Sequence, residues 1–184
     1  MKKTVPAMTA KISPPKMKTN IEKALALLEA VTPLRVDCGK LCGGRCCHAD
    51  KEAEGMRLFP DEPPPKDLRV SDTADGGRLA VCDGTCDRHA RPLACRIFPL
   101  FPYLGTDGRV RAVWDPRAWR VCPLVQGKYC PDRAFIRAVR KAGRLLAATE
   151  SGRRFLKEQA AEIDQLAALI PRWQLLPRRN AHKE

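Results

Sequence analysis

The sequence predicts an α+β fold, because helical and strand-like patterns occupy different parts of its 184 residues. Apolar residues recur at helical spacing near the N-terminus and in the last third of the chain. The middle instead holds two apolar stretches that each turn back at a glycine, which is typical of β-hairpins. Apolar residues make up 44% of the chain and aromatic residues 5%, so we expect a mainly aliphatic core.

The N-terminal pattern predicts one short helix after a disordered arm. Residues 1–18 are rich in lysine and proline, and we expect no fixed structure there. The segment TNIEKALALLEAV then suits a helix that Thr19 or Asn20 caps and that ends before Pro33. The apolar face of this helix would consist of Ile21, Ala24, Leu25 and Leu28.

The middle of the chain predicts loops and two short hairpins. Residues 35–66 read mostly as loop, with the segment GMRLFPDE anchored in the core. The stretch LRVSDTADGGRLAVCDG predicts a hairpin that turns at residues 75–77, and YLGTDGRVRAVWD predicts one that turns at Asp107 and Gly108. Between the hairpins, the segment RIFPLFPY predicts core packing.

Two amphipathic helices are expected over residues 131–176, forming a helical hairpin that packs on a domain of residues 19–130. Pro131 would be the first residue of one helix, and Ser151 would cap the other. Residues 177–184 would be a frayed tail. The first helix would bury Phe135, Ile136, Val139 and Leu146 and expose Arg133, Arg137, Arg140, Lys141 and Arg144. The second would bury Phe155, Leu156, Ile163, Leu166, Ala167 and Ile170.

Nine cysteines form the most informative pattern. The segment CGKLCGGRCCH opens with C-x3-C-x3-C-C, a C-x3-C pair follows, and the remaining three are spread further along. Most of the thiols have glycine or charged neighbours, which are poor surroundings for buried apolar cysteines. The positions are Cys38, Cys42, Cys46, Cys47, Cys82, Cys86, Cys95, Cys122 and Cys130. Such clustering favours a metal site, with zinc or an iron–sulfur cluster as the cofactor.

Basic residues near these cysteines fit the same hypothesis. Lys40, Arg45, Arg88, Arg91 and Arg96 would offset thiolate charge and lower the thiol pKa values. The two glycines at 43 and 44 would let the backbone wrap closely around an ion. We expect segment 35–66 to need the metal in order to fold, because it has so few apolar residues.

The motifs CGKLCGGRCC and RPLACRIFP, with the cysteines at 82, 86 and 122, resemble the YkgJ-type cysteine-cluster proteins. That family is described as a zinc- or iron-chelating domain related to flagellin lysine N-methylase. The resemblance implies eight ligands: Cys38, Cys42, Cys46, Cys47, Cys82, Cys86, Cys95 and Cys122. The first cysteine motif, C-x3-C-x3-C-C, has longer spacing than the C-x2-C-x2-C-C that is common in the family. Cys130 is an alternative to Cys122 as a ligand.

Three hypotheses of function follow. The first is a metal-binding protein with a structural, carrier or partner-binding role, whose partner would be another protein. The second, which the resemblance implies, is an S-adenosylmethionine-dependent protein-lysine N-methyltransferase. The third is a nucleic-acid-binding zinc module, although the basic helix face is favoured as a solvated surface because aromatic residues do not interleave its charges. Adjacent Cys46 and Cys47 are expected to serve different ions or roles.

The chain is expected to be cytoplasmic. The basic start lacks the apolar region of a secretory signal, and no run of 18 apolar residues predicts a membrane span. The net charge of +13 lies mainly outside the cysteine region, since residues 38–130 carry +3 of it. In a reducing compartment, many cysteines indicate metal ligands more often than disulfides.

Overall fold

The structure is a computed structural model, and it describes residues 18–36, 38–47, 55–82, 84, 86–126, 130–171 and 173. All nine cysteines lie within these ranges. The expected tail, and all of the expected arm except Lys18, fall outside them. The helices are α1 (Asn20–Leu27), α2 (Cys38–Cys42), α3 (Leu93–Ile97), α4 (Pro123–Gln126), α5 (Arg133–Ala147) and α6 (Glu150–Ala168). The strands are β1 (Met56–Arg57), β2 (Arg69–Asp72), β3 (Arg78–Val81), β4 (Leu100–Leu104) and β5 (Val110–Trp114).

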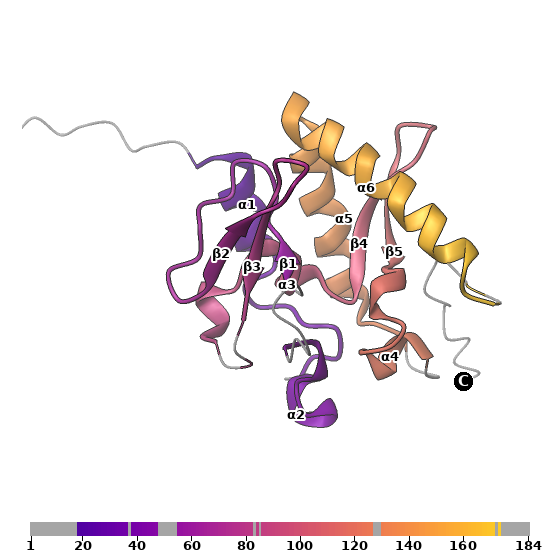
Figure 1. Cartoon of the computed structure of the whole chain (residues 1–184). Helices are drawn as coiled ribbons and strands as arrows, with labels where there is room; N and C mark the ends of the chain where they lie inside the picture. Colours follow the sequence, from indigo (N-terminus) through magenta and orange to yellow (C-terminus); the bar gives the residue numbers. More distant parts are fainter. Residues whose placement is uncertain are drawn as a thin grey trace, which may run out of the picture.

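The chain has the predicted α+β fold, with small antiparallel sheets and two C-terminal helices (Figure 1). One sheet has the strand order β1-β3-β2, and the other consists of β4 and β5. Both predicted hairpins are confirmed. Their turns place Gly76 (φ 76°) and Gly108 (φ 72°) in the left-handed region, which glycine adopts without a steric penalty.

The helix α1 begins where its sequence predicts. The Thr19 side chain accepts a hydrogen bond from the Glu22 amide, and the Glu22 carboxylate accepts one from the Thr19 amide. This reciprocal cap satisfies two amides that would otherwise lack partners at the start of the helix. Ile21, Ala24 and Leu28 are buried, as expected, and Leu25 is partly buried.

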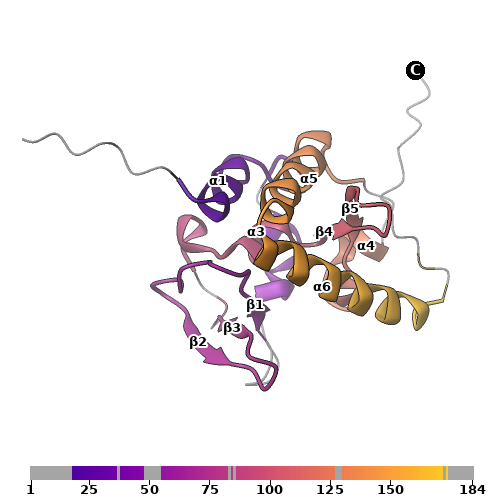
Figure 2. The same ribbon diagram turned by 90° about the horizontal axis from the view of Figure 1, so that it is seen from above.

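One core joins the two ends of the chain. The helix α5 packs against α1 and over both strands of the β4–β5 hairpin, while α6 covers β4 (Figures 1 and 2). The segment RIFPLFPY supplies β4 and is confirmed as core: Ile97, Leu100 and Phe101 are at most 4% exposed. The loop before β2 is anchored through buried Leu58 and Phe59, as expected.

Both C-terminal helices begin at other residues than predicted. Asp132, not Cys130 or Pro131, caps α5, because its carboxylate accepts a hydrogen bond from the Ala134 amide at 2.7 Å. Thr149 caps α6 through the Gly152 amide at 3.1 Å. Ser151 instead donates to the Asp61 carboxylate at 3.1 Å.

The expected faces of the two helices are largely confirmed. All five basic residues of α5 are exposed, and Phe135, Val139 and Leu146 are buried, whereas Ile136 is half-buried. In α6, Phe155, Leu156 and Ile163 are buried, while Leu166, Ala167 and the following Ile170 are half-exposed near its C-terminal end. The described part of residues 35–66 is mostly loop, as predicted, although α2, a 3-10 turn over Arg45–Cys47 and β1 fall within it.

Candidate metal centre

The first cysteine cluster is a short helix followed by a tight reversal. Cys38 and Cys42 are the first and last residues of α2, four residues apart and therefore on one side of the helix. Gly43 and Gly44 both have φ 66°, and the Gly44 amide donates to the Gly39 carbonyl at 3.0 Å. The chain then turns back on itself. No residue of α2 or of the Arg45–Cys47 turn is buried, so the hydrophobic core does not hold this segment.

Cys46 and Cys47 lie next to each other in the 3-10 turn after these glycines. The Cys47 amide donates to the Gly44 carbonyl at 2.7 Å, which closes the turn. The two Sγ atoms are 4.0 Å apart. Cys46 is exposed and Cys47 is half-buried.

The other thiols come from four separate places in the chain. Cys82 directly follows β3, and Cys86 precedes the 3-10 turn Arg88–Ala90. Cys95 lies within α3, and Cys122 immediately precedes α4. All four are half-buried free thiols. The predicted ligands therefore sit at the ends of elements or in short helices, where side chains can reach neighbouring segments.

Electrostatic interactions join Cys46 and Cys122 to the thiols of α2. The pKa of Cys46 is raised first by its hydrogen bond with Cys47 and then by repulsion from Cys47, Cys38 and Cys42. The pKa of Cys122 is raised by burial first and then by Cys38 and Cys42. These repulsions therefore link Cys46 and Cys122 to the same two thiols of α2. We call Cys38, Cys42, Cys46 and Cys122 the first thiol set.

A second neighbourhood gathers around Cys95. The pKa of Cys95 is raised to about 12, by burial first and then by repulsion from Cys47, Cys86 and Cys82. Burial also raises the pKa of Cys82, with added repulsion from Cys86 and Cys47. We call Cys47, Cys82, Cys86 and Cys95 the second thiol set. The two sets meet at Cys46 and Cys47.

Arg91 is the cation of the second set. Its Nε donates to the Cys86 Sγ at 3.3 Å, and the negative charge of Cys86, Cys47 and Cys95 raises the pKa of its guanidinium against the effect of burial. A donor placed on a thiol in this way stabilises the thiolate form. The motif RPLAC thus supplies both a thiol and the arginine that faces its partner thiol.

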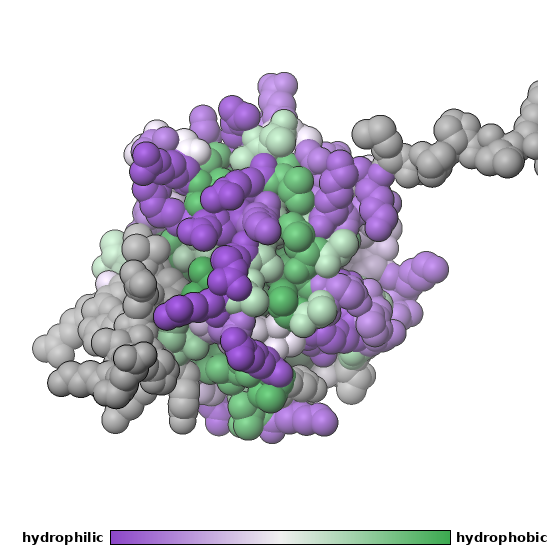
Figure 3. All heavy atoms as spheres, turned by 180° about the vertical axis from the view of Figure 1, so that it is seen from behind, coloured by the Kyte–Doolittle hydropathy of each residue, from purple (hydrophilic) through white to green (hydrophobic). Residues whose placement is uncertain are grey.

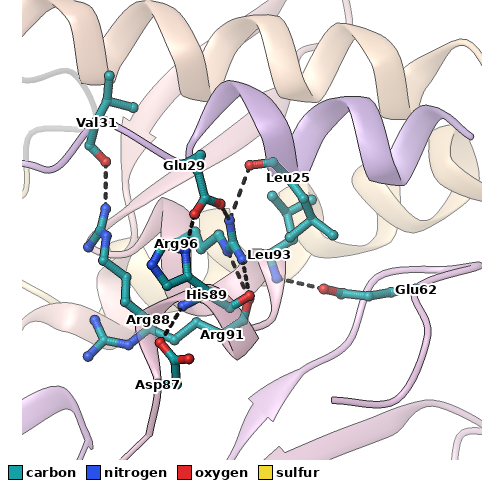
Figure 4. A network of polar contacts seen from close by, with 10 residues as sticks. All are labelled: Leu25, Glu29, Val31, Glu62, Asp87, Arg88, His89, Arg91, Leu93 and Arg96. Carbon is teal, nitrogen blue, oxygen red and sulfur yellow. Dashed lines mark hydrogen bonds and ion pairs between the residues drawn. The ribbon is translucent and has the colours of Figure 1, made fainter. Parts of the chain in front are cut away.

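Arg91 lowers the pKa of Cys95, as expected, but the pKa values of four thiols, Cys46, Cys82, Cys95 and Cys122, are raised overall. Burial and repulsion between thiols outweigh the one arginine nearby. Arg88 instead donates to the Val31 carbonyl at 3.0 Å (Figure 4). Lys40 and Arg45 are exposed.

Arg96 also serves the scaffold rather than the thiols (Figure 4). Its guanidinium donates to the carbonyl groups of His89 at 2.7 Å, Arg91 at 2.9 Å and Leu25 at 3.3 Å, and it pairs with Glu29. The side chain is 8% exposed. Arg96 therefore ties the chain before Cys95 to α1, which fixes the place of α3 relative to the core.

Sequence reasoning missed Glu62, whose carboxylate holds the other end of this arrangement (Figure 4). Glu62 is 3% exposed and accepts hydrogen bonds from the amides of Leu93 at 2.6 Å and Phe59 at 2.9 Å. Leu93 is the first residue of α3, so the carboxylate fixes the start of the helix that carries Cys95. Its position after FPD in a proline-rich loop gave no signal of burial.

In the described part of the chain, the cysteine side chains are not arranged around a position for an ion. Among the described residues, no three histidine, cysteine or carboxylate side chains lie close enough together to hold a metal ion as they stand. All nine cysteines are free thiols. None of the interactions described above, which join the other eight thiols, includes Cys130.

Within the described residues, no helix combines the length and apolarity that a membrane crossing needs.

Comparison with known proteins gives no relative. No family model, no curated protein and no solved structure matches the chain. The resemblance to YkgJ-type proteins and the methyltransferase that it implies therefore stay predictions.

Proposed function

We propose that the chain is a metal-binding protein that uses its two thiol sets as two adjacent four-cysteine sites, for zinc or an iron–sulfur cluster. This proposal is carried by the 4.0 Å contact between the Cys46 and Cys47 Sγ atoms, together with the electrostatic interactions that link these two thiols, directly or through a neighbouring thiol, to the other six. Four thiolates satisfy tetrahedral zinc, and they also hold a cluster. The role is structural, carrier or partner-binding.

The chemistry of the donors supports this proposal. Four mutually repelling thiols are unfavourable as thiolates unless a cation lies between them, and a divalent ion supplies that charge. The Arg91 guanidinium adds a donor to the Cys86 sulfur at 3.3 Å. Because the described thiols are not gathered around a centre, rotation of their side chains would accompany binding. Half-buried, reduced thiols on short elements allow this rotation.

The 4.0 Å separation of the Cys46 and Cys47 Sγ atoms allows two arrangements. With zinc–sulfur bonds of about 2.3 Å, two sulfurs on one tetrahedral ion lie about 3.8 Å apart. The pair could therefore share an ion. We propose instead that each thiol serves its own set, because Cys38 and Cys42 act on Cys46, while Cys47 acts on Cys82 and Cys95.

The proposal also places the chain in the cytoplasm. Eight ligand thiols must stay reduced in order to bind metal, and reducing compartments keep them so. The absence of disulfides among the nine cysteines agrees with this location.

The test is the content of zinc, iron and acid-labile sulfide per chain, measured after purification without oxygen. The variants are Cys46→Ser, Cys47→Ser and the double substitution. We expect each single variant to lose one of the two centres and the double variant to lose both, because each thiol serves a different set. Iron with matching sulfide identifies clusters, and zinc without sulfide identifies zinc sites.

Cys130→Ser is the matched control, since Cys130 is also a half-buried free thiol but lies in neither set. It should keep the full metal content. A wild-type chain without metal, or a Cys130→Ser variant that loses as much metal as Cys46→Ser, contradicts the proposal. If either single substitution alone removes all metal, the two thiols belong to one centre.

A further inference from the structure

A second feature, far from the thiols, is a groove lined by arginines. It lies between the tip of the β4–β5 hairpin, the last turns of α5 and the start of α6, and its volume is about 720 Å³. The lining residues are Gly108, Arg109, Val110, Arg111, Arg140, Arg144, Ala147, Ala148 and Arg153. The hairpin tip and the α5–α6 turn lie at the end of the molecule opposite α2 (Figure 1). We call this feature the arginine groove.

The positive charge of the groove is mostly uncompensated. Arg111 pairs with Asp107, and the Arg153 Nε donates to the Ala147 carbonyl at 3.0 Å. Within the described part of the chain, Arg140 and Arg144 have no acidic partner, whereas Arg109 lies near the Asp107 carboxylate, which accepts a hydrogen bond from the Arg109 amide at 3.1 Å. Five guanidinium groups around one hollow repel each other, and this repulsion is relieved when an anion binds.

The groove is a firm part of the fold. Val110 begins β5 and packs against the core, while Arg140 and Arg144 lie one turn apart on α5. Beneath them, Gly143 brings α5 into close contact with Pro102 and Val110. The arginines are therefore presented by a helix and a hairpin whose relative position is fixed by packing.

Basic residues continue beyond the groove along the same helix. Arg133, Arg137 and Lys141 are exposed on α5, so the positive surface follows its length, about 22 Å at 1.5 Å per residue. In Figure 3, which shows the molecule from behind, hydrophilic and hydrophobic side chains are interspersed over this face. This length exceeds what one small anion would need and suits a chain of regularly spaced negative charges.

The lining residues indicate which class of polyanion would bind in the groove. Arginine guanidinium groups match phosphate oxygens in pairs. Proteins that bind single strands also use aromatic rings on which bases stack, and the groove lining contains no aromatic residue. We propose that the arginine groove and the basic face of α5 bind the phosphate backbone of double-stranded nucleic acid, without reading its sequence. This site is separate from the metal centre and does not depend on it.

The test is fluorescence anisotropy of a labelled DNA duplex of about 20 base pairs with the full chain, as purified without oxygen, over a series of salt concentrations. The variant Arg140→Ala/Arg144→Ala removes two groove contacts. We expect affinity to fall about tenfold or more and the slope of log K against log salt to fall by about 2. Lys66→Ala/Arg69→Ala, which removes two exposed charges near and on β2, is the control and should bind as the wild type does.

Three results would overturn the proposal: no duplex binding by the wild type, an equal loss in the control variant, or equally tight binding of polyglutamate. The last would mean that the groove takes acidic polypeptides. Melting temperature and metal content verify that the variants are folded. Both should be unchanged, because removing two of five mutually repelling charges does not weaken packing. Since metal content is measured apart from duplex binding, failure of one proposal leaves the other standing.

Discussion

At the residue scale, Glu62 shows how a buried carboxylate can position a thiol that it does not touch. Burial raises the pKa of Glu62, and the amides of Leu93 and Phe59 lower it again. The two oxygens each accept one of these amides, so each carboxylate oxygen has a hydrogen-bond partner. The carboxylate therefore connects the loop before β2 to the start of the helix that carries Cys95.

Glu62→Gln is expected to destabilise the protein by about 1–3 kcal/mol. The amide group of glutamine can accept only one of the two backbone hydrogen bonds, and its NH₂ would face the other N–H donor. Urea unfolding followed by circular dichroism measures the free energy of unfolding. Glu158→Gln, on the exposed side of α6, is the control and should change stability by less than about 0.5 kcal/mol. Equal stability of the two variants would show that the buried hydrogen bonds contribute nothing.

At the element scale, the contact between α5 and the β4–β5 hairpin depends on a residue without a side chain. A Cβ atom on Gly143 would lie 2.5 Å from the Cβ of Pro102 and 2.7 Å from the Cγ1 of Val110. Both distances are too short for carbon atoms in contact. The helix can therefore approach the hairpin this closely because position 143 is glycine.

Gly143→Ala tests this contact, since two effects oppose each other. Alanine favours a helix interior by about 1 kcal/mol, while overpacking a core costs about 1–3 kcal/mol. We expect a net loss of about 1–2 kcal/mol, because proline and a strand residue cannot move aside freely. Thermal unfolding measures it, with Arg137→Ala on the exposed face as the control. A Gly143→Ala variant more stable than the wild type would mean that the hairpin adapts.

At the scale of the whole molecule, the elements of the core are held by buried apolar residues, whereas the segment that carries the first four thiols is not. The core takes residues from α1, α3, α4, β4, β5, α5 and α6. In contrast, α2 and the Arg45–Cys47 turn bury no residue. Cys95 lies in a core element, since Leu93, Ala94 and Ile97 around it are buried, and Cys122 packs against the core. Removal of metal should therefore affect the two parts unequally.

We expect chelation of the metal to loosen residues 38–47 and 82–86 while leaving α5 and α6 folded. Hydrogen exchange followed by mass spectrometry should show faster exchange in those segments, whereas the peptides of α5 and α6 keep their protection. The helical circular dichroism signal should fall slightly. Loss of protection in α5 and α6 as well would show that the metal stabilises the whole fold. Unchanged exchange everywhere would count against any metal site.

Local signals in the sequence predicted the elements well. Thr19 and Glu22 at capping-box spacing, the glycines at 76 and 108, and the helical period of α5 each specify structure through near neighbours. The starts of α5 and α6 were missed because several adjacent polar residues could act as the cap. The two-residue strand β1 is too short to leave a pattern.

The site was less predictable, because its organisation depends on residues far apart in the chain. Cysteine spacing identified the thiols, yet their division into two sets requires the positions of Cys95 and Cys122 in space. The sequence could not separate the roles of Arg91 and Arg96, which lie five residues apart. In the structure, Arg91 donates a hydrogen bond to a thiol, whereas Arg96 donates to backbone carbonyls.

The packing of α1 on α5 also constrains how the chain can assemble during its synthesis. The Asn20 side chain donates to the Leu145 carbonyl at 3.0 Å, and the Asp132 amide donates to the Pro33 carbonyl at 2.8 Å. On a ribosome, α1 is synthesised long before α5, so the apolar face of α1 stays exposed to solvent until the last third of the chain is made. Contacts of such long sequence separation slow folding, and during that interval the nascent chain would rely on a chaperone or on transient partners.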